Sequence, residues 1–291
     1  MKIDEKWIDL YRAIYGEKFN RVLTIGTKKE GFKNYNVRSI DQLSEYIEEY
    51  YPQKEFYMSL YNFDTDENIL KWDRLQKEKY EEHSKKRYIM FRFKNDTTII
   101  RQETEELNEI QKYMFIRRSI NLGHDKKAFY ELQKVYDLIK SLFNIEAVPL
   151  YTGFNEFYLF INLDEDLELE NPSLTMYYLH KFIEDYCELE TLNYERVDVF
   201  SQIIVIPGTQ DSQSRLYAKI YGRDTQYHEL IEYASKKDLI ETYKVPQNQD
   251  SSSLRVLLEI LDGEISKRIT DDEVDVRSFD LNELFQEVRQ A

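Results

Sequence analysis

The chain has 291 residues, of which 42% are apolar and 14% aromatic, so it can bury a sizeable core and is not a disordered chain. A formal net charge of −15 argues against a general polyanion binder, because phosphate contacts need clustered Lys and Arg. The single Cys187 excludes an intramolecular disulfide, and no apolar run approaches the length of a membrane span. We therefore expect a cytoplasmic globular protein that binds protein partners more readily than nucleic acid.

The first part of the chain alternates between helical and strand patterns. In chain order the expected elements are a helix over 7–16, a strand over 21–27, a helix over 40–51, a strand over 55–63, a helix over 70–87 and a strand over 87–93. The stretch NDTTII that follows is expected to continue the sheet after a turn.

The second part is richer in helix. The expected elements are two helices within 102–143, a strand over 157–163, a helix over 173–192, strands over 202–208 and 215–222, and an α segment over 225–243. This order predicts an α+β (α/β-like) fold with a mixed sheet flanked by helices. We expect that domain to span 1–244, followed by a polar linker over 245–253 and an acidic helical tail over 254–291.

Simple catalytic signatures are absent from the sequence, and with 8 Gly in the chain a P-loop is not available. The most direct candidate for a metal-binding acidic pair is Asp64 and Asp66. These residues lie two positions apart after a strand, so both carboxylates could face one Mg²⁺. The same residues are common in ordinary turns, because they hydrogen-bond their own backbone. The pair is therefore compatible with two interpretations, a metal site and an ordinary loop.

Three segments carry more information when taken in order: the turn and strand TGFNEFYLFI (152–161), VDVF around Asp198, and VIPGTQDSQSRLYAKI (205–220). Their order and spacing resemble the archaeo-eukaryotic primase superfamily, to which small-subunit DNA primases belong. The resemblance covers residues 20 to 222. It implies a nucleotidyltransferase ancestry with a nucleotide site on the sheet.

The resemblance also implies that the catalytic residues are degenerate. The strand that carries two metal-binding aspartates in the family matches 87–93, so that Arg92 and Lys94 stand at those positions. The family histidine that contacts nucleotide phosphates matches Tyr158, and a family glycine matches Glu156. Val205 stands where the family has an arginine, and Asp198 alone matches an acidic position. The residues implied to form a nucleotide-like site are Arg92, Lys94, Thr152, Tyr158, Asp198 and Thr209.

These residues lead to a primary hypothesis and two alternatives. The first is a primase-like accessory or architectural subunit of a plasmid, viral or mobile-element replication system, without cofactors or catalysis of its own. The second is an active, divergent primase or primase-polymerase that uses Asp64, Asp66 and Asp198 with Mg²⁺ or Mn²⁺. The third is an acidic protein-binding module or DNA mimic unrelated to replication.

The end of the chain, SFDLNELFQEV, is typical of an acidic amphipathic helix with a capping box that starts at Asp280. Its apolar residues are Phe279, Leu284, Phe285 and Val288. Such a helix either folds back on its own domain or docks in a groove of a polymerase, helicase or single-strand-binding protein.

Overall fold

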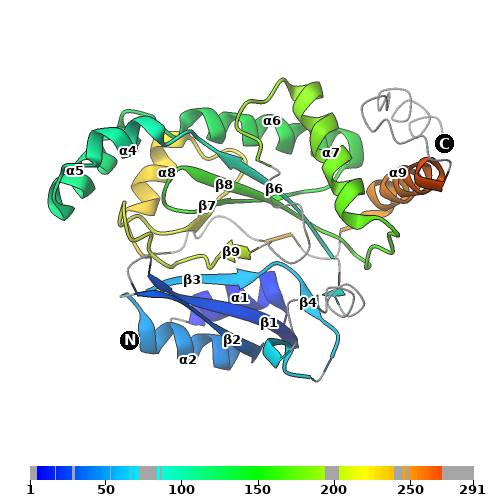
Figure 1. The fold of residues 1–291 in the computed structure, drawn as a ribbon, viewed down its shortest axis with the longest axis horizontal. Coiled ribbons are helices and arrows are strands. Elements are labelled where there is room, and N and C mark those ends of the chain that lie inside the picture. Colours follow the sequence, from blue (N-terminus) through cyan, green and yellow to red (C-terminus); the bar gives the residue numbers. More distant parts are fainter. Residues whose placement is uncertain are drawn as a thin grey trace.

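The computed structural model describes residues 5–16, 18–27, 30–52, 54–65, 67–71, 84–85, 87–193, 203–238, 245–246 and 249–270. Two four-stranded antiparallel sheets lie one above the other in Figure 1, with helices on their outer sides. Across these ranges no helix combines the length and apolar character that crossing a bilayer requires. The α+β class expected from the sequence is confirmed.

The first sheet has the strand order β2-β1-β3-β9. Its members are β1 (Lys18–Thr27), β2 (Gly31–Ser39), β3 (Glu55–Ser59) and β9 (Ile203–Val205). Two helices, α1 (Glu5–Tyr15) and α2 (Ile40–Tyr50), lie on this side of the molecule (Figure 1). The short elements beside it are β4 (Asn62–Phe63), β5 (Ser84–Lys85) and the 3-10 helix η1 (Ile69–Lys71).

The second sheet has the order β10-β7-β8-β6. Its strands are β6 (Tyr88–Lys94), β7 (Val148–Tyr151), β8 (Glu156–Asn162) and β10 (Lys219–Ile220). The helices of this half are α4 (Thr98–Thr104), α5 (Glu109–Asn121), α6 (Lys126–Phe143), α7 (Pro172–Cys187), α8 (Tyr227–Ala234) and α9 (Ser252–Thr270). In Figure 1, α6 and α7 cover the upper face of this sheet.

Strand alternation assigns each face of the second sheet to a different core. On β8, Phe157, Leu159 and Ile161 pack in the core beneath the helices, whereas Tyr158 and Phe160 pack in the core between the two sheets. Strand β6 obeys the same rule, with its odd residues toward the helices and Met90 toward the first sheet. Arg92 and Lys94 therefore share the inter-sheet face with Tyr158.

Helix α9 is part of the core on the helical side. Its buried apolar residues are Leu254, Leu257, Leu258, Leu261 and Ile265. The carboxylate of Asp262 accepts hydrogen bonds from the backbone nitrogens of Glu170 (2.6 Å) and Asn171 (2.9 Å), and from the Thr175 hydroxyl (2.7 Å). These bonds fix α9 at the N-terminus of α7. Residues 271–291, with the proposed partner-binding side chains, lie outside the described ranges.

Two expectations from the sequence are wrong. The segment NDTTII forms the start of α4 and not a strand, because the Asp96 carboxylate accepts a hydrogen bond from the Thr98 amide (2.8 Å) and starts a helical turn. Residues 84–85, expected at the end of a helix, form β5. The expected helix 40–51 is present as α2, and the Ser39 side chain caps it by accepting from the Gln42 amide.

Candidate functional site: a cleft between the two sheets

A cleft of about 510 Å³ opens between the two sheets, at the end where β6 and β8 face β3. The loop after β9 and helices α4 and α5 complete its walls. Its polar lining residues are Thr24, Glu55, Tyr57, Arg92, Lys94, Thr97, Arg101, Thr104, Thr152, Asn155, Glu156, Tyr158, Thr209, Gln210, Asp211 and Gln213. A cleft of this volume is of the size that small-molecule sites have in proteins.

The register between β6 and β8 sets the second-sheet side of the cleft. Arg92 lies directly opposite Tyr158, and Lys94 lies directly opposite Glu156. Directly opposed residues of antiparallel strands have neighbouring side chains on one face. The side chains of Arg92, Lys94, Glu156 and Tyr158 therefore lie together on one face of the β6–β8 pair.

Arg92 and Glu156 form a two-point ion pair in this cleft. Arg92 Nη2 lies 2.7 Å from Glu156 Oε1 and Nε lies 3.2 Å from Oε2, and each side chain is 17% exposed. The Tyr158 hydroxyl donates to Glu156 Oε2 at 3.1 Å. The Glu156 carboxylate thus neutralises the charge of Arg92.

The turn 152–155 is held in shape by its own polar groups. Gly153 has φ +98°, and a Cβ there would lie 2.7 Å from the Leu216 carbonyl oxygen. The Thr152 hydroxyl lies 3.0 Å from the carbonyl oxygens of Phe154 and Glu156, and the Asn95 amide donates to the Asn155 carbonyl at 3.0 Å. The turn therefore presents Glu156 and Tyr158 to the cleft from a fixed backbone.

The opposite side of the cleft carries two carboxyl groups, Glu55 and Asp211. The hydroxyls of Tyr57 (2.9 Å) and Ser212 donate to Glu55, which is 5% exposed. Asp211 Oδ1 accepts from the backbone nitrogens of Gln213 (3.0 Å) and Ser214 (2.7 Å). Burial raises the pKa of the Asp211 carboxyl, and the nearby Glu55 raises it further.

The cleft brings together five of the six residues expected to form a nucleotide-like site, namely Arg92, Lys94, Thr152, Tyr158 and Thr209. Asp198 and Asp66 lie outside the described residues. Asp64 lines a different cavity, beside Arg87 and Asp164. The role of these residues and the three-aspartate alternative remain predictions.

The β6 side of this cleft does not favour a divalent metal ion. Strand β6 contributes the cations Arg92 and Lys94 to the lining, and cations repel Mg²⁺. Within the described ranges, no three His, Cys, Asp or Glu side chains group closely enough to hold a metal ion.

No family model and no curated protein matches this chain. Among solved structures, the polymerase domain of Mycobacterium tuberculosis Ligase D, solved in complex with DNA, is similar over 82% of this chain and 89% of that one, with 11% identity and a TM-score of 0.44. Primase RepB' is similar over 94% of this chain and 66% of that one, with 6% identity and a TM-score of 0.49. The similarity concerns the chain path and assigns no role to any residue of the cleft.

Replacing Glu156 by glutamine is expected to strengthen anion binding in the cleft by about fivefold, because it removes a negative charge that is paired with Arg92 and lies opposite Lys94. The measurement is fluorescence anisotropy with a labelled nucleoside triphosphate at low salt. Glu190→Gln is the matched control, since Glu190 pairs with Lys127 on the exposed surface. Equal affinities of Glu156→Gln and the wild type would contradict this role of the ion pair.

Proposed function

We propose that the chain is a primase-like protein without polymerase chemistry, which acts as an accessory or architectural subunit in DNA replication of the plasmid, viral or mobile-element type. The observation that supports this most directly is the Arg92–Glu156 pair on the inter-sheet face. The family resemblance implies a two-carboxylate metal site at this point of the strand. Here the strand carries two cations, and the carboxylate opposite them is already paired.

The polar lining of the cleft supports a changed function for this site more than the loss of the site. Its lining contains the charged residues Lys94, Arg101, Glu55 and Asp211, and the polar residues Thr209, Gln210 and Gln213 of the loop after β9. A cleft that had lost every ligand would be expected to fill with apolar side chains, because burying polar groups costs free energy. We infer that the cleft contacts a polar surface of a replication partner or of its template.

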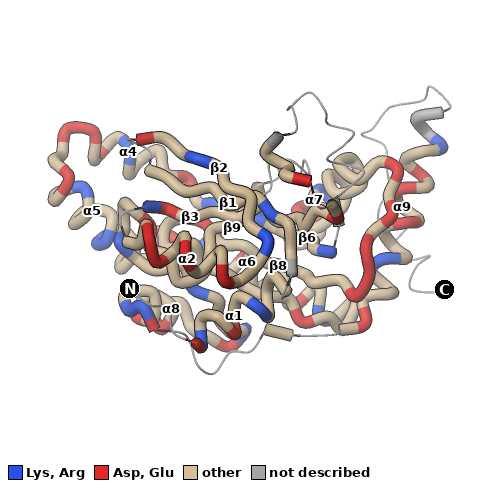
Figure 2. The backbone as a smooth tube through the Cα atoms, turned by 90° about the horizontal axis from the view of Figure 1, so that it is seen from below, with Lys and Arg blue, Asp and Glu red and all other residues tan. Residues whose placement is uncertain are grey.

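The charge distribution favours a protein partner over DNA. Figure 2 shows acidic and basic residues mixed along the chain, with acidic positions prominent on α2 and α9. The net charge of −15 would oppose binding of a polyanion except at a locally basic surface. The apolar residues Phe279, Leu284, Phe285 and Val288 supply a second contact, for a polymerase, helicase or single-strand-binding protein.

A primer-synthesis assay tests the loss of catalysis. Purified protein with single-stranded template, ribo- or deoxynucleotides, and Mg²⁺ or Mn²⁺ is expected to give no extension products above background. Asp198→Ala is expected to behave like the wild type. Primers made by the wild type and lost in Asp198→Ala would overturn the proposal and favour the three-aspartate alternative.

Binding to purified replication proteins encoded with this chain tests the accessory role. Interferometry is expected to show binding to one of them that Leu284→Ala/Phe285→Ala weakens at least tenfold. The matched control is Val256→Ala/Ile260→Ala, since these two residues of α9 are 46% and 38% exposed. If no such protein binds, while a basic protein unrelated to replication does, the DNA-mimic alternative replaces this one.

A further inference from the structure

Helices α4 and α5 form an arm at one end of the molecule, as Figure 1 and Figure 2 both show. The inner side of the arm packs on the protein, because Ile116 and Ile120 of α5 are buried in the core and Ile116 also lines the cleft. The outer side of α5 is apolar as well. Ile110 (71% exposed), Met114 (64%) and the C-cap residue Leu122 (75%) lie there, and we call these three residues the outer stripe.

Helical periodicity aligns the outer stripe. Met114 follows Ile110 by four positions and Leu122 follows Met114 by eight, so the three side chains lie along one side of α5, together with the exposed Arg118. Single exposed apolar side chains are normal in a soluble protein, but a surface helix usually has a polar outer face. An aligned row of large apolar side chains therefore favours association, because covering it removes apolar surface from water.

The charged residues of the arm are sorted by sign. Residues 102–111 contain four glutamates and no Lys or Arg, whereas residues 112–123 contain three Lys or Arg and no Asp or Glu. They are Glu103, Glu105, Glu106 and Glu109 in the acidic segment, and Lys112, Arg117 and Arg118 in the basic segment. None of them forms an ion pair with another residue that the structure describes. The dipole of α5 suits this order of charges, but it does not explain the exposed apolar side chains.

We propose that the outer stripe docks on the outer stripe of a second copy of this chain, with the two α5 helices antiparallel about a twofold axis. A parallel arrangement would set the acidic segments of the two copies side by side. The antiparallel arrangement sets the acidic segment of each copy beside the basic segment of the other, and the apolar residues pack between them. Because the 13 residues of α5 span only about 20 Å, we expect a weak dimer with a dissociation constant on the order of 10 µM.

This dimer leaves both clefts open. The residues of the arm that line the cleft include Ile100, Thr104 and Ile116, which are buried on the inner side and away from the outer stripe. The dimer would therefore hold two clefts on either side of one shared pair of arms. The proposal does not depend on a role of the cleft in replication, since it rests on the outer side of the arm alone.

Sedimentation velocity of the full chain at low salt, from about 1 µM to about 200 µM, tests the association. We expect the monomer at the lowest concentration and the dimer at the highest. Ile110→Ala/Met114→Ala should weaken the dimer at least tenfold. The matched control is Val256→Ala/Ile260→Ala on α9, which should leave it unchanged, since these residues are 46% and 38% exposed at the other end of the molecule (Figure 1). A monomer at every concentration, or equal dimerisation of Ile110→Ala/Met114→Ala and the wild type, would overturn the proposal.

A charge exchange tests the antiparallel arrangement. Glu106→Arg/Glu109→Arg makes the arm wholly basic at its ends, and Arg117→Glu/Arg118→Glu makes it predominantly acidic. Each variant alone is expected to dimerise at least tenfold more weakly than the wild type, because like charges then meet. An equimolar mixture of the two should restore the dimer, which also shows that both variants are folded. Failure of the mixture to associate, or dimers of either variant as tight as those of the wild type, would overturn the arrangement.

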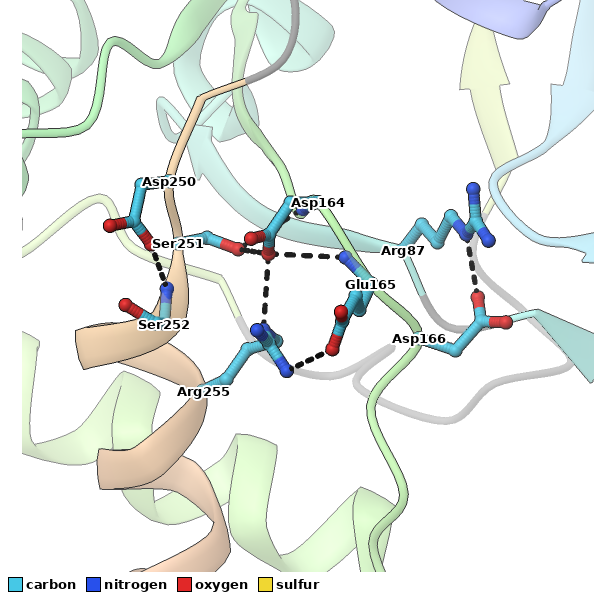
Figure 3. Close-up of polar contacts among 8 residues, drawn as sticks. All are labelled: Arg87, Asp164, Glu165, Asp166, Asp250, Ser251, Ser252 and Arg255. Carbon is cyan, nitrogen blue, oxygen red and sulfur yellow. Dashed lines mark hydrogen bonds and ion pairs between the residues drawn. The ribbon is translucent and has the colours of Figure 1, made fainter.

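Two further variants exclude effects from the opposite end of the molecule. Figure 3 shows Arg255 of α9 paired with Asp164 (3.1 Å) and Glu165 (2.8 Å). Glu165→Arg is a charge reversal at this site, and we expect it to dimerise like the wild type. Leu284→Ala/Phe285→Ala is expected to do the same. A dimer lost in either of these variants would place the interface near α9 or the C-terminal segment and overturn the assignment to α5.

Discussion

Replacing Gly208 by alanine is expected to lower the free energy of unfolding by about 3 kcal/mol. Gly208 has φ +82°, and a Cβ there would lie 2.4 Å from Cη2 of Trp7. Trp7 is 6% exposed, and the Tyr11 hydroxyl of the same helix donates to the Pro207 carbonyl at 2.9 Å. Because the ring is buried and Tyr11 ties α1 to the loop after β9, the ring cannot move away without opening the contact between α1 and that loop.

Gly31 provides the matched control, because it has the same φ of +82° but open space around its Cβ position. Gly31→Ala should cost only the backbone strain, about 1 kcal/mol. The measurement is denaturant unfolding of both variants. In a Trp7→Leu background the additional cost of Gly208→Ala should fall toward that of Gly31→Ala, and equal costs in the wild-type background would contradict the packing argument.

Replacing Asp125 by asparagine is expected to change how stability depends on pH. Asp125 is fully buried beneath the turn that precedes β8, and burial raises the pKa of its carboxyl from 3.8 to about 6. Between these values the folded state holds a proton that the unfolded state has lost, so the free energy of unfolding falls as pH rises. The decrease in the free energy of unfolding is complete above about pH 6 and amounts to about 3 kcal/mol.

The hydrogen bonds around Asp125 explain why the protonated form suits this site. The Tyr151 hydroxyl lies 2.9 Å from Asp125 Oδ2 and 3.0 Å from the Gly153 carbonyl oxygen, and it has one proton to donate. With a protonated Asp125, the carboxyl donates to Tyr151 and Tyr151 donates to Gly153. With an ionised Asp125, Tyr151 must turn to the carboxylate and release the turn that carries Thr152.

Urea unfolding between pH 3.5 and pH 7.5 measures the effect. The stability of Asp125→Asn relative to the wild type should rise by about 3 kcal/mol from the acid to the neutral end. Asp185→Asn, at an exposed ion pair of α7, should give a nearly constant difference over the same range. A constant difference for Asp125→Asn as well would mean that the buried carboxyl stays ionised throughout.

Alternation along the sequence was sufficient to predict the strands that form the cleft. In RYIMFRF and FYLFINL every second residue is buried against the helices, which leaves Arg92 and Tyr158 on the other face. Strand β2 was not predicted, because GFKNYNVRS is largely exposed at the edge of its sheet and has no apolar alternation. The strand forms because its backbone pairs with β1, and this pairing cannot be predicted from the side chains of β2.

Only some residues of the candidate site could be predicted from the sequence, for a related reason. A family pattern places residues along one chain segment, and this was enough for Arg92, Lys94, Thr152, Tyr158 and Thr209. Glu55 lies on β3, and it meets the Asp211 loop only because β3 pairs with β9, which leads into that loop. No local spacing connects residues 55 and 211, so neither could be singled out. The ion pair between Arg92 and Glu156 similarly requires the strand register.

The docking of α9 beside α7 fixes the point from which the following residues start. Residues 279 to 288 are at most 18 positions beyond Thr270, which limits their distance from the end of α9 to about 60 Å even for a fully extended chain. A partner captured there would experience a high effective concentration near the rest of this protein. A weak contact at the cleft would then be sufficient, because the tether and the cleft would act together as two sites of one bivalent protein.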